Sequence, residues 1–163
     1  MELYLKNKII MIAAASKGMG YAIARQCASE GAKVSIASRS RIHIEEAAQR
    51  IREETGGDIT PFVFNAEDGT TIEKWTGDTI KKYGQINSLL VNAGGPPTGL
   101  FNDFDDEAWQ RAFNLTLMSA VRMIRAVLPS MKQQGGGSIL TITSSSVKEP
   151  IDVLLLSNVM RSG

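Results

Sequence analysis

Short apolar runs alternate along the chain with longer stretches in which apolar residues recur every three or four positions. Runs of four to eight residues, rich in β-branched side chains and bounded by turn residues, are typical of buried strands. Five such runs predict strands: KIIMIA (8–13), KVSIAS (33–38), TPFVF (60–64), NSLLV (87–91) and SILTIT (138–143). Runs that are apolar nearly throughout indicate strands that are covered on both faces.

The stretches between these runs have the periodicity of amphipathic helices, and each ends at glycine, a common residue just after a helix. Three of them are 18–31, 42–57 and 70–84. A longer stretch, 105–137, is expected to hold two helices joined near Phe113 and Asn114. A further helix is expected to start near Val153.

Strands that alternate with helices predict an α/β fold, in which right-handed crossovers connect the strands of a parallel sheet. We therefore expect a parallel sheet of five strands with helices on both faces. The chain contains no internal repeat, low-complexity tract or linker. Residues 1–163 are therefore expected to form a single domain.

The composition is that of an ordinary soluble globular protein, with 43% hydrophobic and 21% charged residues among 163. The balance of 18 basic and 17 acidic residues gives no electrostatic reason to expect nucleic acid or an anionic membrane as a partner. Cys27 is the single cysteine, which predicts neither a disulfide framework nor a cysteine metal site. The start of the chain lacks the pattern of a signal peptide, so a cytoplasmic location is expected.

Gly18 and Gly20 fall where the first predicted strand turns into a helix. Glycines at such a turn let the backbone approach a pyrophosphate, which then lies on the free N–H groups of the helix N-terminus. Many strand–helix turns carry two glycines without binding a nucleotide, so the spacing alone leaves both interpretations open.

The segment LKNKIIMIAAASKGMGYAIA (5–24) resembles the opening of the short-chain dehydrogenase/reductase family, whose pattern is T-G-x-x-x-G-x-G. Gly18 and Gly20 match its second and third glycines, whereas Ala13 and Ala14 stand where the family usually has Thr and Gly. Because an alanine favours negative φ, we expect the loop to differ from the family's at Ala14. The resemblance extends in register over the whole chain. It implies an α/β fold with a doubly wound, Rossmann-like sheet of five strands in the order 3-2-1-4-5, and a single dinucleotide-binding domain over residues 1–163.

Three later motifs carry the same resemblance. The segment LLVNAGG (89–95) resembles the family's N-A-G motif, FNLTLMSAV (113–121) contains the helix asparagine, and GSILTITSSS (137–146) contains the catalytic serine. The resemblance implies that Asn114 holds a water in a proton relay and that Ser144 contacts the substrate. It also implies these cofactor-binding positions: Ala14, Ser16, Lys17, Gly18, Met19, Gly20, Ser38, Arg39, Asn65, Ala66, Asn92, Ala93 and Gly94.

The tip of the second strand favours NADP(H) as the cofactor. An acidic residue there would bind the adenosine ribose and disfavour a 2′-phosphate, but the sequence has Ser38, Arg39 and Ser40. Arg39 can form a forked contact with a phosphate, and Lys17 resembles the second basic position of NADP-preferring relatives. The alternative is that both are solvated surface cations.

The family's active tyrosine and lysine are replaced. Counting from Ser144, their positions fall on Ser157 and Arg161. A serine hydroxyl is a far weaker acid than a tyrosine hydroxyl, and an arginine stays protonated and cannot join a proton relay. Other proton donors are conceivable on the loop after Ser144, namely Lys148, Glu149 and Asp152, although a solvated loop explains them as well. His43, the only histidine, is expected near the adenosine end in a surface role.

Three interpretations remain open. The chain resembles the 3-oxoacyl-carrier-protein-reductase-like branch of the family, which implies an NADP(H)-dependent oxidoreductase acting on a carbonyl or alcohol with atypical catalytic residues. Alternatively, it is a cofactor-binding sensor or supporting subunit without turnover. We also expect the chain to be C-terminally incomplete, because full-length relatives continue beyond this point. The resemblance further implies a homo-oligomer formed through helix 114–134 and the helix that starts near Val153.

Overall fold

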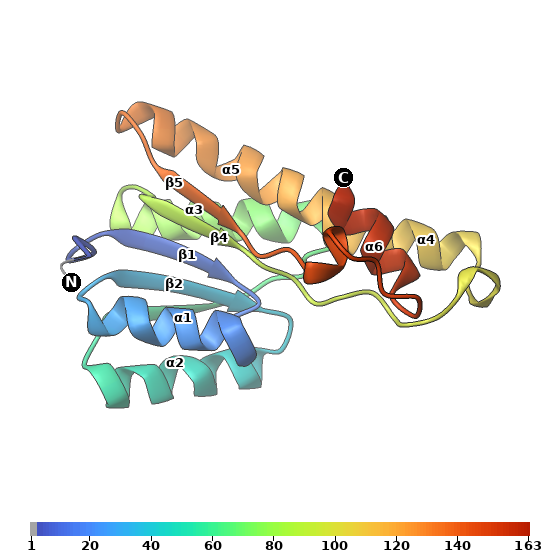
Figure 1. The fold of residues 1–163 in the computed structure, drawn as a ribbon. Helices are drawn as coiled ribbons and strands as arrows, with labels where there is room; N and C mark the ends of the chain where they lie inside the picture. Colours follow the sequence, from blue (N-terminus) through green and yellow to red (C-terminus); the bar gives the residue numbers. More distant parts are fainter. Residues whose placement is uncertain (1–2) are drawn as a thin grey trace.

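The computed structural model describes residues 3–163 and contains one parallel sheet of five strands. The strand order β3-β2-β1-β4-β5 confirms the predicted topology, with β1 in the centre (Figure 1). The strands are β1 (Ile9–Ala13), β2 (Lys33–Ser38), β3 (Ile59–Val63), β4 (Ser88–Val91) and β5 (Ser138–Thr141). The order reverses between β1 and β4, which places a topological switch point at the carboxyl ends of these two strands.

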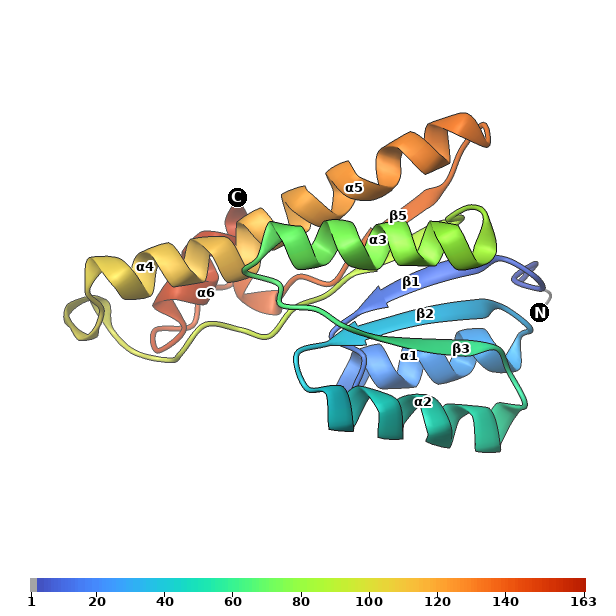
Figure 2. The same cartoon turned by 180° about the vertical axis from the view of Figure 1, so that it is seen from behind.

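Helices cover both faces of the sheet, as the continuous apolar strands predict. The sheet-covering helices are α1 (Gly18–Ser29), α2 (Arg41–Thr55), α3 (Gly69–Tyr83) and α5 (Ser119–Gln133). Alternate side chains of β1 point to opposite faces of the sheet. Ile10 and Ile12 belong to the core under α1 and α2, and Met11 belongs to the core under α3 and α5. Figure 2 shows α3 and α5 together on the face opposite α1 and α2.

The long stretch after β4 forms two helices that are joined without a turn. The short helix α4 (Asp106–Ala112) continues through a π-helical segment, η2 (Phe113–Met118), into α5. The joint therefore lies where the sequence predicts it, but it is one turn of wider helix and not a break. Such π-helical turns occur frequently at functional sites.

Beyond the carboxyl ends of the strands lie α4 and α6 (Leu155–Ser162), together with the short 3₁₀ turns η1 (Phe101–Asp103) and η3 (Ser145–Val147) (Figure 1). A parallel bridge between Gly99 and Leu154 joins the loops that lead into them.

The two edge strands differ. β3 carries Pro61, a residue suited to an edge, and all four residues of β5 are exposed. Across residues 3–163 no helix combines the length and apolar character that a membrane span requires.

The turn from β1 into α1 contradicts one expectation. Ala14 has a φ of 51°, in the left-handed region, so the expected negative φ is wrong. The reason lies in close packing on both sides of the residue. A Cβ at Gly20 would lie 2.6 Å from the Ala14 carbonyl oxygen, and the Ala15 N–H donates to the Ala37 carbonyl at 3.2 Å. The backbone at Ala14 therefore adopts a conformation that suits glycine, and this conformation is strained for an alanine.

Replacing Ala14 with glycine is expected to stabilise the fold. A left-handed alanine costs about 1–2 kcal/mol. The greater conformational freedom of glycine in the unfolded chain offsets about 0.4–1 kcal/mol of the stability gained by removing this strain. A net gain of about 0.5–1 kcal/mol should appear in urea unfolding of Ala14→Gly. The matched control is Ala126→Gly in α5, which should lose about 1 kcal/mol because a helical glycine is unfavourable. Equal losses in both variants would contradict a strained Ala14.

At the amino end of β3, away from the switch point, a hydrogen-bonded cluster connects the last turn of α3 to the start of β3. The Tyr83 hydroxyl donates to Asp58 Oδ1 at 2.9 Å and lies 2.6 Å from Thr60 Oγ1. The Lys82 ammonium also contacts Thr60 Oγ1. Burial, reinforced by the hydrogen bond and the charge of Asp58, raises the pKa of Tyr83 to about 12.

This raised pKa predicts a loss of stability in strong base. The folded protein holds the Tyr83 proton more tightly than the unfolded chain, whose tyrosine pKa is about 10. The stabilisation is therefore complete below pH 10 and is lost as the pH rises through about 12. In urea unfolding between pH 9 and 12, Tyr83→Phe should flatten this decline, whereas Tyr4→Phe, at a residue that is 78% exposed, should leave it unchanged. Parallel pH profiles for the two variants would refute the assignment.

Candidate functional site

A cavity of about 510 Å³ opens at the switch point of the sheet. Loops that follow β1, β2, β3 and β4 all contribute to its wall, because the carboxyl ends of parallel strands meet at one edge. The lining residues are Ala14, Ser16, Lys17, Gly18, Ser38, Arg39, Ser40, His43, Phe64, Ala66, Asn92, Ala93, Gly94, Gly95 and Leu115. No carboxylate is among them, and Lys17 and Arg39 supply two cations.

Ten of the thirteen positions proposed for cofactor binding line this cavity, and three do not. Gly20 is buried against the end of β1, where it permits the close approach of α1. Met19 is 63% exposed. The Asn65 side chain stabilises the turn in which it lies, because its Oδ1 accepts a hydrogen bond from the Glu67 N–H at 3.2 Å. A cofactor contact by the Asn65 side chain, which the resemblance implies, would share Oδ1 with this bond or use Nδ2.

Sequence reasoning missed four lining residues: Ser40, Phe64, Gly95 and Leu115. Ser40 caps α2, and its Oγ accepts from the His43 N–H at 3.3 Å. This cap brings His43 to the wall beside Arg39, at the end expected for the adenosine. A serine directly before the first helical period is the signal that could have indicated the cap.

Asn92 connects the loop after β4 to the end of β1. Its Nδ2 donates to the Ala13 carbonyl oxygen at 3.3 Å. This bond spans the switch point, where the two strands diverge at their carboxyl ends. It therefore fixes the position of one side of the cavity.

Asn114 lies in the π-helical segment η2. Its Oδ1 accepts from Arg122 Nη2 at 3.3 Å, and Arg122 Nη1 donates to the Glu67 carbonyl at 2.9 Å. Arg122 thus connects the helix joint to the loop after β3. This contact uses one of the two lone pairs of Asn114 Oδ1, so the second lone pair and the Nδ2 donors remain for a water.

The proposed catalytic serine begins the turn η3, directly after β5. Ser144 Oγ accepts two hydrogen bonds from Ser146, one from its N–H at 3.2 Å and one from its hydroxyl at 2.8 Å. The loop beyond is exposed, and Lys148, Glu149 and Asp152 all lie on it. In residues 3–163 the side chains of these three make no hydrogen bond or ion pair with another side chain.

The residues at the tyrosine and lysine positions meet next to the end of β5. Ser157 is 8% exposed on α6, and Arg161 lies one turn further along. Arg161 Nε donates to Ser157 Oγ at 3.1 Å, and its Nη1 donates to the Ile142 carbonyl at 3.4 Å. Burial lowers the pKa of Arg161 from its ordinary value. The guanidinium therefore bridges α6 to the strand end two residues before Ser144.

A second cavity, of about 350 Å³, continues from the first and shares Asn92 and Ala93 with it. It lies between the ends of β4 and β5, the helix α5 and the end of α6, and Arg161 is the cation in its wall. Thr116 also lines it, and the Thr116 hydroxyl oxygen is buried without a hydrogen-bond partner. A polar ligand that reached this space would find a donor cation in its wall.

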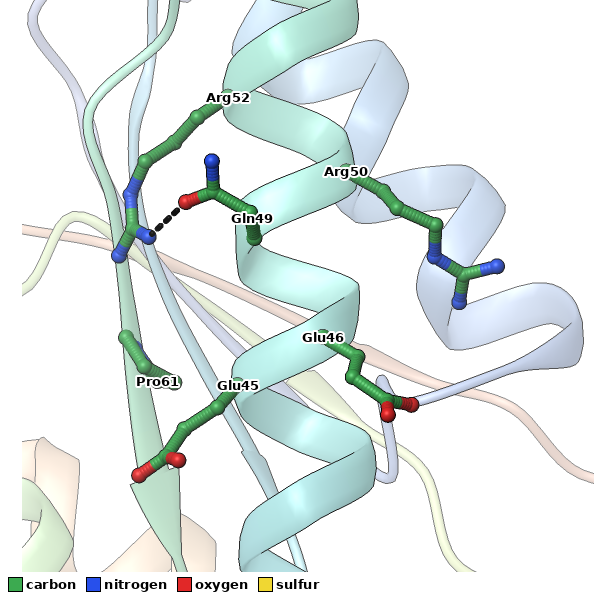
Figure 3. A pocket seen from close by; sticks show the side chains of 6 residues that line it. All are labelled: Glu45, Glu46, Gln49, Arg50, Arg52 and Pro61. Atoms are coloured by element: carbon green, nitrogen blue, oxygen red, sulfur yellow. Dashed lines mark hydrogen bonds between the residues drawn. The ribbon is translucent and has the colours of Figure 1, made fainter.

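A separate groove runs along α2 and the edge strand β3, lined by Glu45, Glu46, Gln49, Arg50, Arg52 and Pro61 (Figure 3). Its charged side chains diverge from the helix and do not converge on one point. Arg52 already donates to the Ile59 carbonyl at 2.6 Å and to Gln49 Oε1 at 3.5 Å. This groove is therefore explained by packing at the sheet edge. The part of the chain that the structure describes has no group of three or more potential metal ligands.

Comparison with known proteins matches residues 8–155 to the family model of short chain dehydrogenases. Dehydrogenase/reductase SDR family member 4 of Homo sapiens is 30% identical over 147 residues, which cover 90% of this chain and 52% of that protein. The 7alpha-hydroxysteroid dehydrogenase of Bacteroides fragilis is 35% identical over 144 residues, which cover 86% and 55%. The chain spans about half the length of these curated relatives.

Two solved structures match nearly the whole fold. L-sorbose reductase from Gluconobacter frateurii, complexed with NADPH and L-sorbose, superposes with a TM-score of 0.96 at 27% identity, covering 99% of this chain and 62% of that one. A 7 alpha-hydroxysteroid dehydrogenase, complexed with NADH and 7-oxo glycochenodeoxycholic acid, gives 0.93 at 26% identity with coverage of 99% and 62%. None of these matches specifies the 3-oxoacyl-carrier-protein-reductase-like branch. The chain belongs to the short-chain dehydrogenase/reductase family.

Proposed function

We propose that this chain binds NADP(H) and is part of an oxidoreductase that interconverts a carbonyl compound and an alcohol. The observation that carries the proposal is the cavity at the switch point, in which the glycine turn, the tip of β2 and the N-A-G segment converge. Similar structures hold NADPH or NADH, which supports a nicotinamide cofactor. Bound in this cavity, the nicotinamide would supply or accept a hydride.

The preference for NADP(H) over NAD(H) rests on charge. Lys17 and Arg39 line the cavity, and no acidic residue lines it. Among the described residues Arg39 makes no ion pair, so its guanidinium is available to a phosphate. The N-terminus of α2, with Ser40 and His43, lies at the same wall and adds the positive end of a helix dipole. A 2′-phosphate would meet complementary charge there.

Replacing Arg39 with alanine tests the preference. A charge-assisted contact of about 1.5–3 kcal/mol corresponds to roughly 10- to 100-fold in affinity. The dissociation constant for NADPH should rise by about that factor in Arg39→Ala, whereas that for NADH should stay within roughly twofold. Arg41→Ala is the matched control, because Arg41 is exposed and pairs with Glu45 at 3.3 Å. Titration by fluorescence or calorimetry provides the measurement, and equal losses for both cofactors would contradict a 2′-phosphate contact.

The reaction site would lie where Ser144 and α6 approach the first cavity. Ser144 can donate its hydroxyl to a substrate carbonyl, and Arg161 provides a fixed positive charge at the Ile142 carbonyl, two residues before Ser144. The position of the family tyrosine holds Ser157, which cannot supply a proton comparably. We therefore expect weak activity on simple carbonyls. The substrate class is a small carbonyl compound or alcohol, and a 3-oxoacyl thioester is one candidate.

A cofactor-binding protein without turnover is the second candidate. It is favoured by the contact between Arg161 and Ser157, which engages both dyad positions in a bond between side chains of one helix. A sensor or supporting subunit would need the nucleotide cavity and not the proton donor.

We also propose that the protein is cytoplasmic and forms a homo-oligomer. Exposed apolar residues on the outer helices, such as Leu128 and Val159, support an oligomer.

Restoring the family dyad distinguishes these two candidates. The variant Ser157→Tyr with Arg161→Lys regains an acid–base group, and such a group contributes about 10²- to 10⁴-fold in rate. We expect NADPH oxidation with ketones and 3-oxoacyl thioesters to rise by at least about tenfold over the native protein. The NADPH dissociation constant should be unchanged, which checks that the variant folds.

The same assay has two informative alternatives. Brisk turnover by the native pair, with no gain in the double variant, would mean that another group supplies the proton, and Glu149→Gln and Lys148→Met would be assayed next. Adding Ser144→Ala to the double variant should remove most of the gained rate and leave a measurable remainder. If neither form turns over any substrate while both bind NADPH, the protein is a cofactor-binding protein and the proposed oxidoreductase activity is wrong.

A further inference from the structure

The three consecutive serines after β5 have different environments. Ser145 is exposed, and its side chain makes no hydrogen bond with another described residue. Ser146 is only 1% exposed, and the turn η3 directs it back beneath Ser144. A hydroxyl that is this deeply buried needs a partner. Its partner is the Ser144 hydroxyl oxygen, at 2.8 Å.

Counting hydrogen bonds shows what this contact does to Ser144. A serine hydroxyl has one proton to donate and two lone pairs that accept. The Ser146 N–H and the Ser146 hydroxyl both donate to Ser144 Oγ, at 3.2 and 2.8 Å. The two bonds occupy both lone pairs. Only the proton of Ser144 then remains free for a ligand.

We propose that Ser146 is a positioning residue that fixes Ser144 as a hydrogen-bond donor toward the substrate carbonyl oxygen. The inference rests on the proposed oxidoreductase function and extends it to a residue outside the dyad. A donor chain from Ser146 through Ser144 to the carbonyl also polarises each successive bond. Ser146 moves no proton in the net reaction, because its hydroxyl is buried and regains nothing from solvent.

The local backbone makes this arrangement rigid. Ser144 is extended, with φ −148° and ψ 150°, and caps the turn. The Val147 N–H donates to the Ser144 carbonyl at 3.2 Å, and the Lys148 N–H donates to the Ser145 carbonyl at 3.0 Å. The side chain of Ser144 is therefore held between the strand end and the turn. Its oxygen cannot turn toward a ligand as an acceptor without breaking the bonds from Ser146.

The test is a rate comparison of Ser146→Ala with Ser145→Ala as the matched control. Loss of one net hydrogen bond predicts a fall in kcat for carbonyl reduction of about 3- to 10-fold in Ser146→Ala. Ser145→Ala should keep the native rate, and the NADPH dissociation constant should stay the same in both. In a Ser144→Ala background, Ser146→Ala should cost nothing further, because Ser146 acts only through Ser144. Rates are measured in the native protein or, if it is inactive, in the variant with the restored dyad.

Urea unfolding of the serine variants shows whether the positioning role of Ser146 is wrong or the proposed oxidoreductase function is wrong. The shifts of the urea midpoint for Ser144→Ala and Ser146→Ala should not add in the double variant, since each removes the same bond. Additive shifts, or an equal rate loss with and without Ser144, would overturn the positioning role. Non-additive shifts, with no carbonyl turnover in any background, would support the bond between the serines and overturn the oxidoreductase proposal instead.

Discussion

The contact between Gly20 and the Ala14 carbonyl oxygen is the constraint on which the site depends. A Cβ at position 20 would lie 2.6 Å from that oxygen, closer than non-bonded atoms approach, so only glycine lets α1 begin directly against the end of β1. This approach sets the angle of α1, forces Ala14 to a positive φ of 51° and leaves the helix N-terminus open at the switch point. The Asn92 bond to Ala13 then braces the other side. The cavity at the switch point opens between these two fixed loops, and the loops after β2 and β3 complete its wall.

The parallel sheet and most of the cavity wall could be predicted from the sequence because they follow from local signals. Apolar runs and helical periods indicate a parallel sheet covered on both faces, the resemblance to the family adds the strand order, and the carboxyl ends of parallel strands must meet at one edge. Gly18 and Arg39 line the cavity for that reason. The conformation of Ala14 could not be predicted in the same way. Its local preference is for negative φ, and the packing of α1 against β1, which no single residue encodes, overrides that preference.

The contacts that orient the candidate catalytic groups were also beyond the sequence. Arg122 bonds to Asn114 and to the Glu67 carbonyl, across 8 and 55 positions of the chain, and nothing in the periodicity marks it. The π-helical turn at Asn114 depends on hydrogen-bond register rather than on composition. The run of three serines was visible, but which of them faces inward depends on the turn η3. Side-chain networks of this kind require coordinates because their members come from separate elements.

The charge and hydrogen bonding near β5 suit the stabilisation of an oxyanion better than the transfer of a proton. Arg161 stays protonated, because an arginine side chain does not lose its proton in proteins, and it has no carboxylate partner among residues 3–163. Its field is therefore not cancelled by a neighbouring anion. Ser144, with its lone pairs filled by Ser146, can only donate. In the proposed reaction both groups favour negative charge on a carbonyl oxygen, and in many enzymes such electrostatic stabilisation accelerates the reaction more than proton transfer does. The proton then has to come from a group other than Ser157, and this requirement explains why weak activity is expected while the binding residues remain in place.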